Sequence, residues 1–246
     1  MGRRLSLADR IHIFKQRPDF VCLPEYWMLD ETVGDYHRAA LNRTEYLEYL
    51  SRTSEELTTC LVGGTVVEAD EDRLYNVCPI FDRGRSVGRY RKMHPTEGEI
   101  SKGITPGDDI GVFDVDGVRI GVMVCADVFY PEHYLGMAAR EVDLIFVPTV
   151  SPLRPDDTIN DKQARDDRYF VSGALDSGAY TIKVCGVGSF LGKPLQGRTL
   201  VAAPWGLLDV VDYNREHATR ILSITLDLDE LHDFRRKIQR AGVGEA

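Results

Sequence analysis

A cysteine stands where a strongly apolar stretch gives way to a turn. Cys125 closes the run that begins at Val118, and Ala126 follows at once. This β-branched run, opened by the turn-forming pair Asp116-Gly117, predicts a buried strand that ends at the thiol. A nucleophile in that place meets its substrate while the backbone N–H groups of the next turn point at the same spot and stabilise an oxyanion. Cys125 and the Ala126 N–H are therefore expected to share one site.

Two charged side chains occupy comparable positions. A short apolar segment that begins at Pro18 ends in the carboxylate of Glu25, and the basic stretch Gly88–Pro95 closes a β-like segment at Lys92. A thiol, a carboxylate and an ammonium group, each at the end of a predicted strand, are the groups that acyl transfer through a thioester needs. They would serve as nucleophile, proton carrier and charge stabiliser.

The other cysteines carry no comparable signal. All four lie in apolar, strand-like surroundings and are interpreted as core residues: Cys22, Cys60, Cys78 and Cys185. No CxxC pair and no Cys/His ligand spacing occurs, so we expect neither a metal site nor a redox dithiol. Unpaired-looking cysteines, an odd total of 5 and no recognisable signal peptide together predict a reducing, cytoplasmic location.

The segments that carry these residues resemble the motifs of the carbon–nitrogen hydrolase family, also called the nitrilase superfamily. The resemblance covers about residues 18 to 238 and rests, in the family's order, on Leu23-Pro-Glu25, Tyr90-Arg-Lys92-Met-His94 and Gly121–Asp127, with further similarity at Leu74-Tyr-Asn76 and Pro106-Gly-Asp108. It implies that Cys125 attacks the substrate carbon and that Glu25 serves as general base and then general acid. It also implies that Lys92 and the Ala126 N–H hold the oxyanion.

Many members of the family carry a second glutamate seven residues after the lysine. That position is Glu99 in this chain, and Glu97 is the alternative. The spacing to Pro106-Gly107 favours Glu99, which we include among the predicted catalytic residues. Asp127 is expected to fix the turn after the cysteine rather than to move protons.

The predicted substrate pocket is less well defined. Four aromatic residues flank the expected site and either shape the acyl pocket or belong to the core: Tyr26, Trp27, Phe129 and Tyr130. Arg154, in the loop 149–157, is predicted to pair either with a substrate carboxylate or with Asp156 or Asp157. Val128 stands where many amidase-like members have an arginine, which removes one other cation that would bind a carboxylate.

Length and patterning predict one domain. The chain has 246 residues, 43% of them apolar, and residues 1–246 are expected to form a single unit. Helical spacing in residues 6–16, 32–58 and 161–177 alternates with β-rich segments at 61–68, 74–81, 86–91, 118–125, 144–148 and 180–187. The resemblance implies an α/β fold, a four-layer α-β-β-α sandwich of two mixed sheets covered by helices. Only 17 residues precede Pro18 and they look helical, so the family's first strand is expected to be missing or shortened.

Charge narrows the choice of partners. The net charge of −9 and the pI near 5.2 disfavour nucleic acid and anionic membranes, because phosphate contacts need clustered basic residues. No apolar stretch approaches the ~18 residues of a membrane span. The expected partner is a small amide or N-carbamoyl compound, with no cofactor, and the resemblance implies a homodimer or a larger homo-oligomer.

The sequence therefore predicts an amidohydrolase that cleaves a non-peptide carbon–nitrogen bond of an amide or N-carbamoyl compound through a Cys125 thioester. Nitrile hydrolysis is the alternative on the same site. It is disfavoured because Ala126 follows the cysteine where nitrilases have a tryptophan and then a glutamate. Two alternatives come from other classes: a non-catalytic binding module on this fold and a metal-dependent phosphoesterase.

Overall fold

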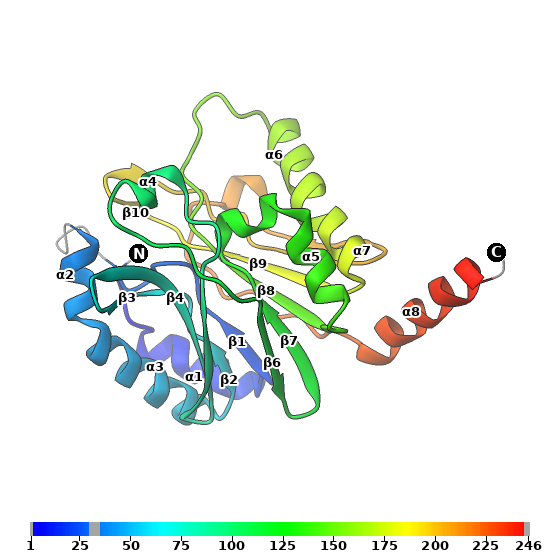
Figure 1. The fold of residues 1–246 in the computed structure, drawn as a ribbon, viewed down its shortest axis with the longest axis horizontal. Helices are drawn as coiled ribbons and strands as arrows, with labels where there is room; N and C mark the ends of the chain where they lie inside the picture. Colours follow the sequence, from blue (N-terminus) through cyan, green and yellow to red (C-terminus); the bar gives the residue numbers. More distant parts are fainter. Residues whose placement is uncertain (1, 30–34, 244–246) are drawn as a thin grey trace.

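Two mixed β-sheets packed face to face form the centre of the molecule in the computed structural model, which describes residues 2–29 and 35–243 (Figure 1). Successive strand residues point to opposite faces of a sheet, so each sheet has one face for its partner and one for helices. Cys60 and Ile80 of the first sheet meet Ile120 and Phe146 of the second in the apolar core between them.

The first sheet contains five strands in the described part of the chain, in the order β1-β2-β4-β3, with β5 also paired to β4. Strand β1 runs parallel to β2, and the other pairs are antiparallel. Strand β1 therefore lies at the edge of this sheet. The strands are β1 (Phe20–Cys22), β2 (Cys60–Val62), β3 (Val66–Asp70), β4 (Arg73–Asp82) and β5 (Arg85–Arg91).

The second sheet contains six strands among the described residues, in the order β13-β12-β9-β8-β7-β6. Its central strands β7, β8 and β9 are parallel, so their carboxyl ends meet at one edge. The strands are β6 (Gly111–Val115), β7 (Val118–Val122), β8 (Leu144–Thr149), β9 (Tyr180–Cys185), β12 (Leu200–Ala203) and β13 (Gly206–Val210). A small hairpin of β10 (Ser189–Phe190) and β11 (Lys193–Pro194) lies outside both sheets.

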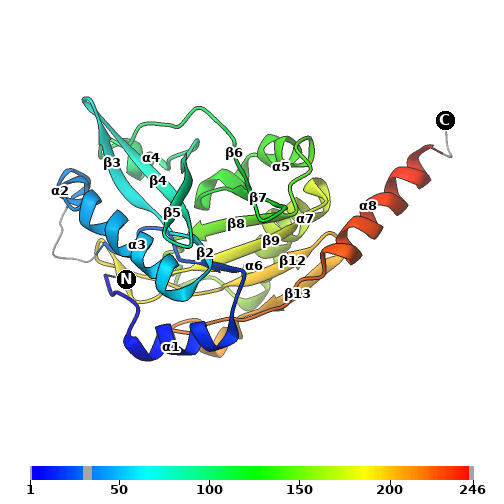
Figure 2. The ribbon, with the colours of Figure 1, turned by 90° about the horizontal axis from the view of Figure 1, so that it is seen from below.

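Helices cover the outer faces. Helices α2 (Tyr36–Leu41) and α3 (Arg43–Leu57) pack on the first sheet, and α1 (Leu7–Gln16) contacts α3. Helices α5 (Pro131–Ala138) and α7 (Ser172–Ser177) pack on the second sheet (Figures 1 and 2). Leu50 and Met137 are among the fully buried side chains of these two helical layers. The predicted four-layer α-β-β-α architecture is confirmed.

Several predicted elements are interrupted. The helix expected over 32–58 is divided at Asn42 into α2 and α3, and its residues 32–34 lie outside the described residues. The strand expected over 61–68 is interrupted between β2 and β3. The helix expected over 161–177 consists of α6 (Ile159–Asp166), a π-helical turn over 167–171 and α7. The strand expected to reach Cys125 stops at Val122, so the prediction of its end was wrong by three residues.

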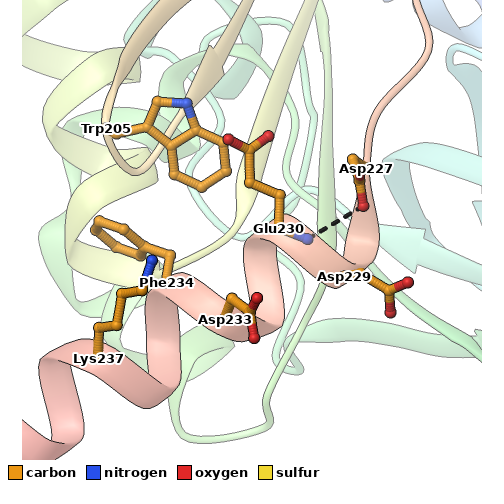
Figure 3. A pocket seen from close by; sticks show the side chains of 7 residues that line it. All are labelled: Trp205, Asp227, Asp229, Glu230, Asp233, Phe234 and Lys237. Atoms are coloured by element: carbon orange, nitrogen blue, oxygen red, sulfur yellow. Dashed lines mark hydrogen bonds between the residues drawn. The ribbon is translucent and has the colours of Figure 1, made fainter.

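The charged C-terminal segment forms α8 (Leu228–Val243), which extends away from the sheets in both views (Figures 1 and 2). A cavity of about 410 Å³ lies where α8 leaves the body, and it contains none of the residues predicted for catalysis (Figure 3). Its lining residues are Trp205, Asp227, Asp229, Glu230, Asp233, Phe234 and Lys237. Among residues 2–29 and 35–243, no helix is both long and apolar enough to cross a membrane.

The break between β2 and β3 brings backbone close to the segment that holds Glu25. Gly64 has a φ of +65°, and a Cβ there would lie 2.2 Å from the Pro24 carbonyl oxygen and 2.9 Å from Trp27 Cδ1. Only glycine adopts this conformation in this space without strain.

We expect Gly64→Ala to lower the free energy of unfolding by about 3 kcal/mol, because it combines left-handed backbone strain with a backbone clash. Gly117→Ala is the matched control: its φ is +83°, but a Cβ there would meet nothing within 4 Å, so it should cost only about 1 kcal/mol. Urea denaturation measures both values. Equal losses in the two variants would contradict the close approach at Gly64.

Candidate active site

Three of the predicted residues follow strands of the two sheets and converge on one place. Glu25 lies three residues after β1, Lys92 directly follows β5, and Cys125 lies three residues after β7. The Lys92 ammonium donates a hydrogen bond of 2.8 Å to Glu25 Oε1. Both side chains are buried, at 1% and 2% exposure, so this ion pair is almost completely removed from water.

Lys92 has a second carboxylate partner. It donates to Glu99 Oε2 at 2.7 Å, so one ammonium group bridges Glu25 and Glu99. Asn76, from the middle of β4, donates through its side-chain amide to Oε1 of both carboxylates, at 2.9 Å each. Glu97 is exposed, so of the two glutamates weighed from the sequence only Glu99 joins the cluster.

The short helix α4 (Glu97–Ile100) fixes Glu99. Thr96 is its N-cap, and the Glu99 side chain accepts from the Thr96 N–H at 2.8 Å, which completes a capping box. The Tyr26 hydroxyl donates to Glu99 Oε1 at 2.8 Å. The Thr96-x-x-Glu99 pattern is a sequence signal that by itself favours Glu99 over Glu97.

Cys125 is held at a strained turn. Its φ is +49°, in the left-handed region that non-glycine residues seldom occupy, and it begins the 3-10 helix η1 (Cys125–Phe129). The N–H of Ala126 lies in the first turn of that helix, where backbone donors lack partners within the helix. The thiol and the Ala126 N–H thus belong to the same turn.

Asp127 fixes this turn, as its position in the sequence suggested. Its Oδ2 accepts from the Val124 N–H and from the Tyr90 hydroxyl, and its Oδ1 accepts from the His94 N–H, all at 2.8 Å. Asp127 is fully buried. It therefore ties the turn after β7 to the segment that carries Lys92.

Val150 joins the thiol to the carboxylate through its backbone. Its N–H donates to Glu25 Oε2 at 2.9 Å, and its carbonyl oxygen accepts from Cys125 Sγ at 3.4 Å. Val150 directly follows β8, the neighbour of β7 in the parallel part of the sheet. Sequence patterning singled out this loop for the pocket but gave no signal for a backbone contact of this kind.

Burial and charge push the two carboxyl groups apart in pKa. Burial raises the pKa of Glu25 above its usual range, although the Lys92 charge opposes this shift. Burial acts in the same direction on Glu99, but Lys92 and the donors from Thr96 and Tyr26 outweigh it and lower that pKa. The shifts therefore favour the ionised form of Glu99, and Glu25 is the carboxyl group that takes up a proton more readily.

The thiol and the ammonium group are strongly shifted as well. Burial raises the pKa of Cys125 well above its usual value, the charge of Glu25 adds to this, and Lys92 opposes it. Burial lowers the pKa of Lys92, but the charges of Glu25 and Glu99 outweigh it and raise the pKa. These shifts favour the neutral form of the thiol and the charged form of the lysine.

The residues predicted for the pocket lie in different surroundings. Tyr26 is buried and stacks on Tyr36 and Phe190, and Trp27 is buried in the apolar cluster under α3. Phe129 and Tyr130 are exposed at 50% and 39%, in the turn that Cys125 begins. These two stay predicted pocket residues, whereas Tyr26 contacts the cluster through Glu99.

Arg154 is exposed and has no ion-pair partner among the described residues. Asp157, one of its predicted partners, instead accepts a two-pronged contact from Arg165 at 2.8 and 2.9 Å. The remaining alternative, a substrate carboxylate, stays a prediction. In residues 2–29 and 35–243, no three His, Cys, Asp or Glu side chains are grouped so that they would hold a metal ion.

Comparison with known proteins shows what the chain is similar to. The family model described as carbon-nitrogen hydrolase matches residues 5–236. Omega-amidase NIT2 of Homo sapiens is 28% identical over 79% of this chain and 71% of that protein. A nitrilase of Pyrococcus abyssi is 31% identical over 77% of this chain and 70% of that protein. The crystal structure of a carbon-nitrogen hydrolase from Helicobacter pylori superposes with a TM-score of 0.82 at 20% identity, over 93% of this chain and 84% of the other, which shows a shared fold.

We expect Asp127→Asn to lower the free energy of unfolding by about 3 kcal/mol. Three buried donors now converge on the two carboxylate oxygens of Asp127, and an amide would offer them only one acceptor atom. Asp114→Asn, at a side chain that is 72% exposed, should change it by less than about 0.5 kcal/mol. Urea denaturation compares the two variants. A loss at Asp127 no larger than that at Asp114 would show that this carboxylate does not hold the turn.

Proposed function

The chain belongs to the carbon–nitrogen hydrolase family, and from that premise we propose that it cleaves a linear amide through a thioester on Cys125, with Glu25 as general base and acid. Membership makes the protein an enzyme that hydrolyses carbon–nitrogen bonds. One observation supports the residue roles above all: Lys92 holds two buried carboxylates beside the backbone of Val150, which also contacts the thiol.

The pKa directions support the assignment of the base. Pairs of carboxyl groups whose environments push their pKa values apart commonly divide the acid–base work between them. Glu25, with its raised pKa, moves the proton, and Glu99, with its lowered pKa, keeps Lys92 charged and in place. The raised pKa of Cys125 makes such a base necessary, because almost no thiolate forms without one.

The proposed reaction has two halves. Glu25 takes the Cys125 proton as sulfur bonds to the substrate carbonyl carbon, and the carbonyl oxygen becomes an oxyanion. When this intermediate collapses, the carbon–nitrogen bond breaks and Glu25 returns the proton to the leaving nitrogen, so ammonia or an amine departs. Water then attacks the thioester with Glu25 again as base, the carbon–sulfur bond breaks, and the thiol regains its proton from Glu25.

Lys92 and Ala126 are the proposed oxyanion donors. The ammonium group has three N–H bonds, two of which point to Glu25 and Glu99, so one is left for the substrate oxygen. The Ala126 N–H supplies the second donor. Removing one such donor commonly costs a factor of about 10² to 10³ in kcat.

The proposed substrate class is a small molecule with an amide or N-carbamoyl group. The human relative is named an omega-amidase, which favours amides. The Pyrococcus relative is named a nitrilase and is 31% identical, so nitriles are the second candidate. Every proposed step uses only groups of this chain and water. Cytoplasmic location and assembly as a homodimer or a larger homo-oligomer stay predictions from the sequence.

Ammonia release from a panel of ω-amides, other small amides, N-carbamoyl amino acids and nitriles tests the proposal, with chelator present throughout. We expect the wild type to act on an amide or carbamoyl compound, and Cys125→Ala to lose at least about 10⁴-fold in kcat because the nucleophile is gone. Lys92→Met should lower kcat by a factor of at least about 10² to 10³, because one oxyanion donor is gone. Cys185→Ala, at a buried cysteine outside the cluster, is the matched control and should keep its kcat.

Turnover by Cys125→Ala at the wild-type rate would refute the thioester. If ammonia were released only from nitriles, nitriles would replace amides as the proposed substrate class. Activity that disappears when the chelator is added would point to a metal-dependent reaction instead.

A further inference from the structure

Asn76 closes a ring of hydrogen bonds around the candidate base. Lys92 joins Glu25 to Glu99 on one side, and the Asn76 amide joins the same two carboxylates on the other, through 2.9 Å bonds to Oε1 of each. Asn76 is completely buried. Its carbonyl oxygen has no hydrogen-bond partner among the described residues, so the two carboxylates alone determine the direction of the amide.

The ring makes the two oxygens of Glu25 unequal. Oε1 accepts from both Lys92 and Asn76, whereas Oε2 accepts from the Val150 N–H. The carbonyl of the same Val150 accepts from Cys125 Sγ, so the backbone of one residue links Oε2 to the thiol, and among the described contacts Oε2 has one donor where Oε1 has two. With both donors on Oε1, the carboxylate cannot rotate without breaking two charge-assisted bonds.

We propose that Asn76 is a positioning residue for the general base: its amide fixes Glu25 so that Oε2 is the oxygen that exchanges the proton with Cys125. This inference rests on the proposed function and adds to it the atom that carries the proton and the residue that selects it. An amide suits this place because it donates two hydrogen bonds without a charge. A second cation would hold both carboxylates ionised, whereas an acid would add a third negative charge.

Loss of the Asn76 donor also favours the protonated form of Glu25, because a hydrogen bond to a carboxylate stabilises the anion. The charged or titratable groups that interact with Glu25 are Lys92, Glu99 and Cys125, together with Tyr26, Tyr36 and Cys185, and the substitution at Asn76 changes none of them. The pH at which Glu25 ionises should therefore rise. Any process that needs Glu25 as a base slows as Glu25 becomes protonated, and this part of its pH profile, the acid limb, should move to higher pH.

The test measures the rate at which iodoacetamide alkylates Cys125 at a series of pH values from acid to neutral, with peptide mass spectrometry as the readout. Alkylation is chosen because it needs no substrate. We expect Asn76→Ala to move the acid limb up by about one pH unit. Asn76→Ser, which keeps one hydroxyl donor, should give a smaller shift. Thr181→Val is the matched control, since Thr181 is equally buried on a strand of the second sheet and its hydroxyl has no partner among the described residues.

With the amide identified by the panel, kcat of Asn76→Ala should fall about 10- to 100-fold with little change in KM, because the base is misplaced and the binding groups remain. An unshifted acid limb in both Asn76 variants would overturn the proposal. A loss of alkylation rate that is equal at every pH would also overturn it, because it would indicate a purely structural role.

Glu25→Gln separates this proposal from the one on which it rests. We expect this variant to lose the acid limb altogether. If it kept the wild-type profile, Glu25 would not be the base, and both proposals would fail together. If Glu25→Gln loses the limb while the Asn76 variants leave it in place, the base assignment stands and only the role of Asn76 is refuted. Circular dichroism of each variant shows that the comparison is made on folded protein.

Discussion

The ion cluster of Lys92 with Glu25 and Glu99 is the interaction on which the rest of the structure depends. Its three side chains are at most 7% exposed. Charges taken out of water are tolerated only when each is paired and hydrogen-bonded, and removal of one partner from such a cluster commonly costs about 3 to 5 kcal/mol. The fold must therefore deliver all three side chains to one place, together with the neutral donors that complete their bonding.

The packed sheets meet this requirement with strand ends. The segments that follow β1 and β5 come from the first sheet, and those that follow β7 and β8 come from the second. Asp127 then joins the turn after β7 to the segment of Lys92, and Val150 joins Glu25 to the thiol. Each sheet supplies part of the site, so neither sheet alone is expected to have it.

Much of this arrangement was predictable from the sequence, because the signals for it lie within short segments of the chain. Glu25 and Cys125 each end an apolar segment and Lys92 closes a β-like one, and a charge or a thiol at such a position is visible without a structure. The four-layer fold followed from the resemblance that these motifs carry, and the structure confirms it. The helical character of residues 7–16 and 43–57 was also evident from spacing.

What sequence reasoning missed depends on contacts between distant segments. Asn76 lies in the middle of a strand, where an asparagine usually weakens the prediction of a strand, and its two partners are 51 and 23 residues away. Val150 acts through its backbone, which no side-chain pattern reports. The strand β7 ends early because Cys125 needs a left-handed turn, and an apolar run gives no sign of such strain.

The central claim is that Cys125 carries the acyl group during turnover. Rapid acid quenching during steady-state hydrolysis of an amide, followed by mass spectrometry of the peptide that contains residue 125, measures this directly. The account predicts that this peptide gains the mass of the substrate less ammonia, and that the adduct disappears when the substrate is exhausted. Rapid turnover of the amide with Cys125 unmodified throughout, or with the adduct on another residue, would contradict it.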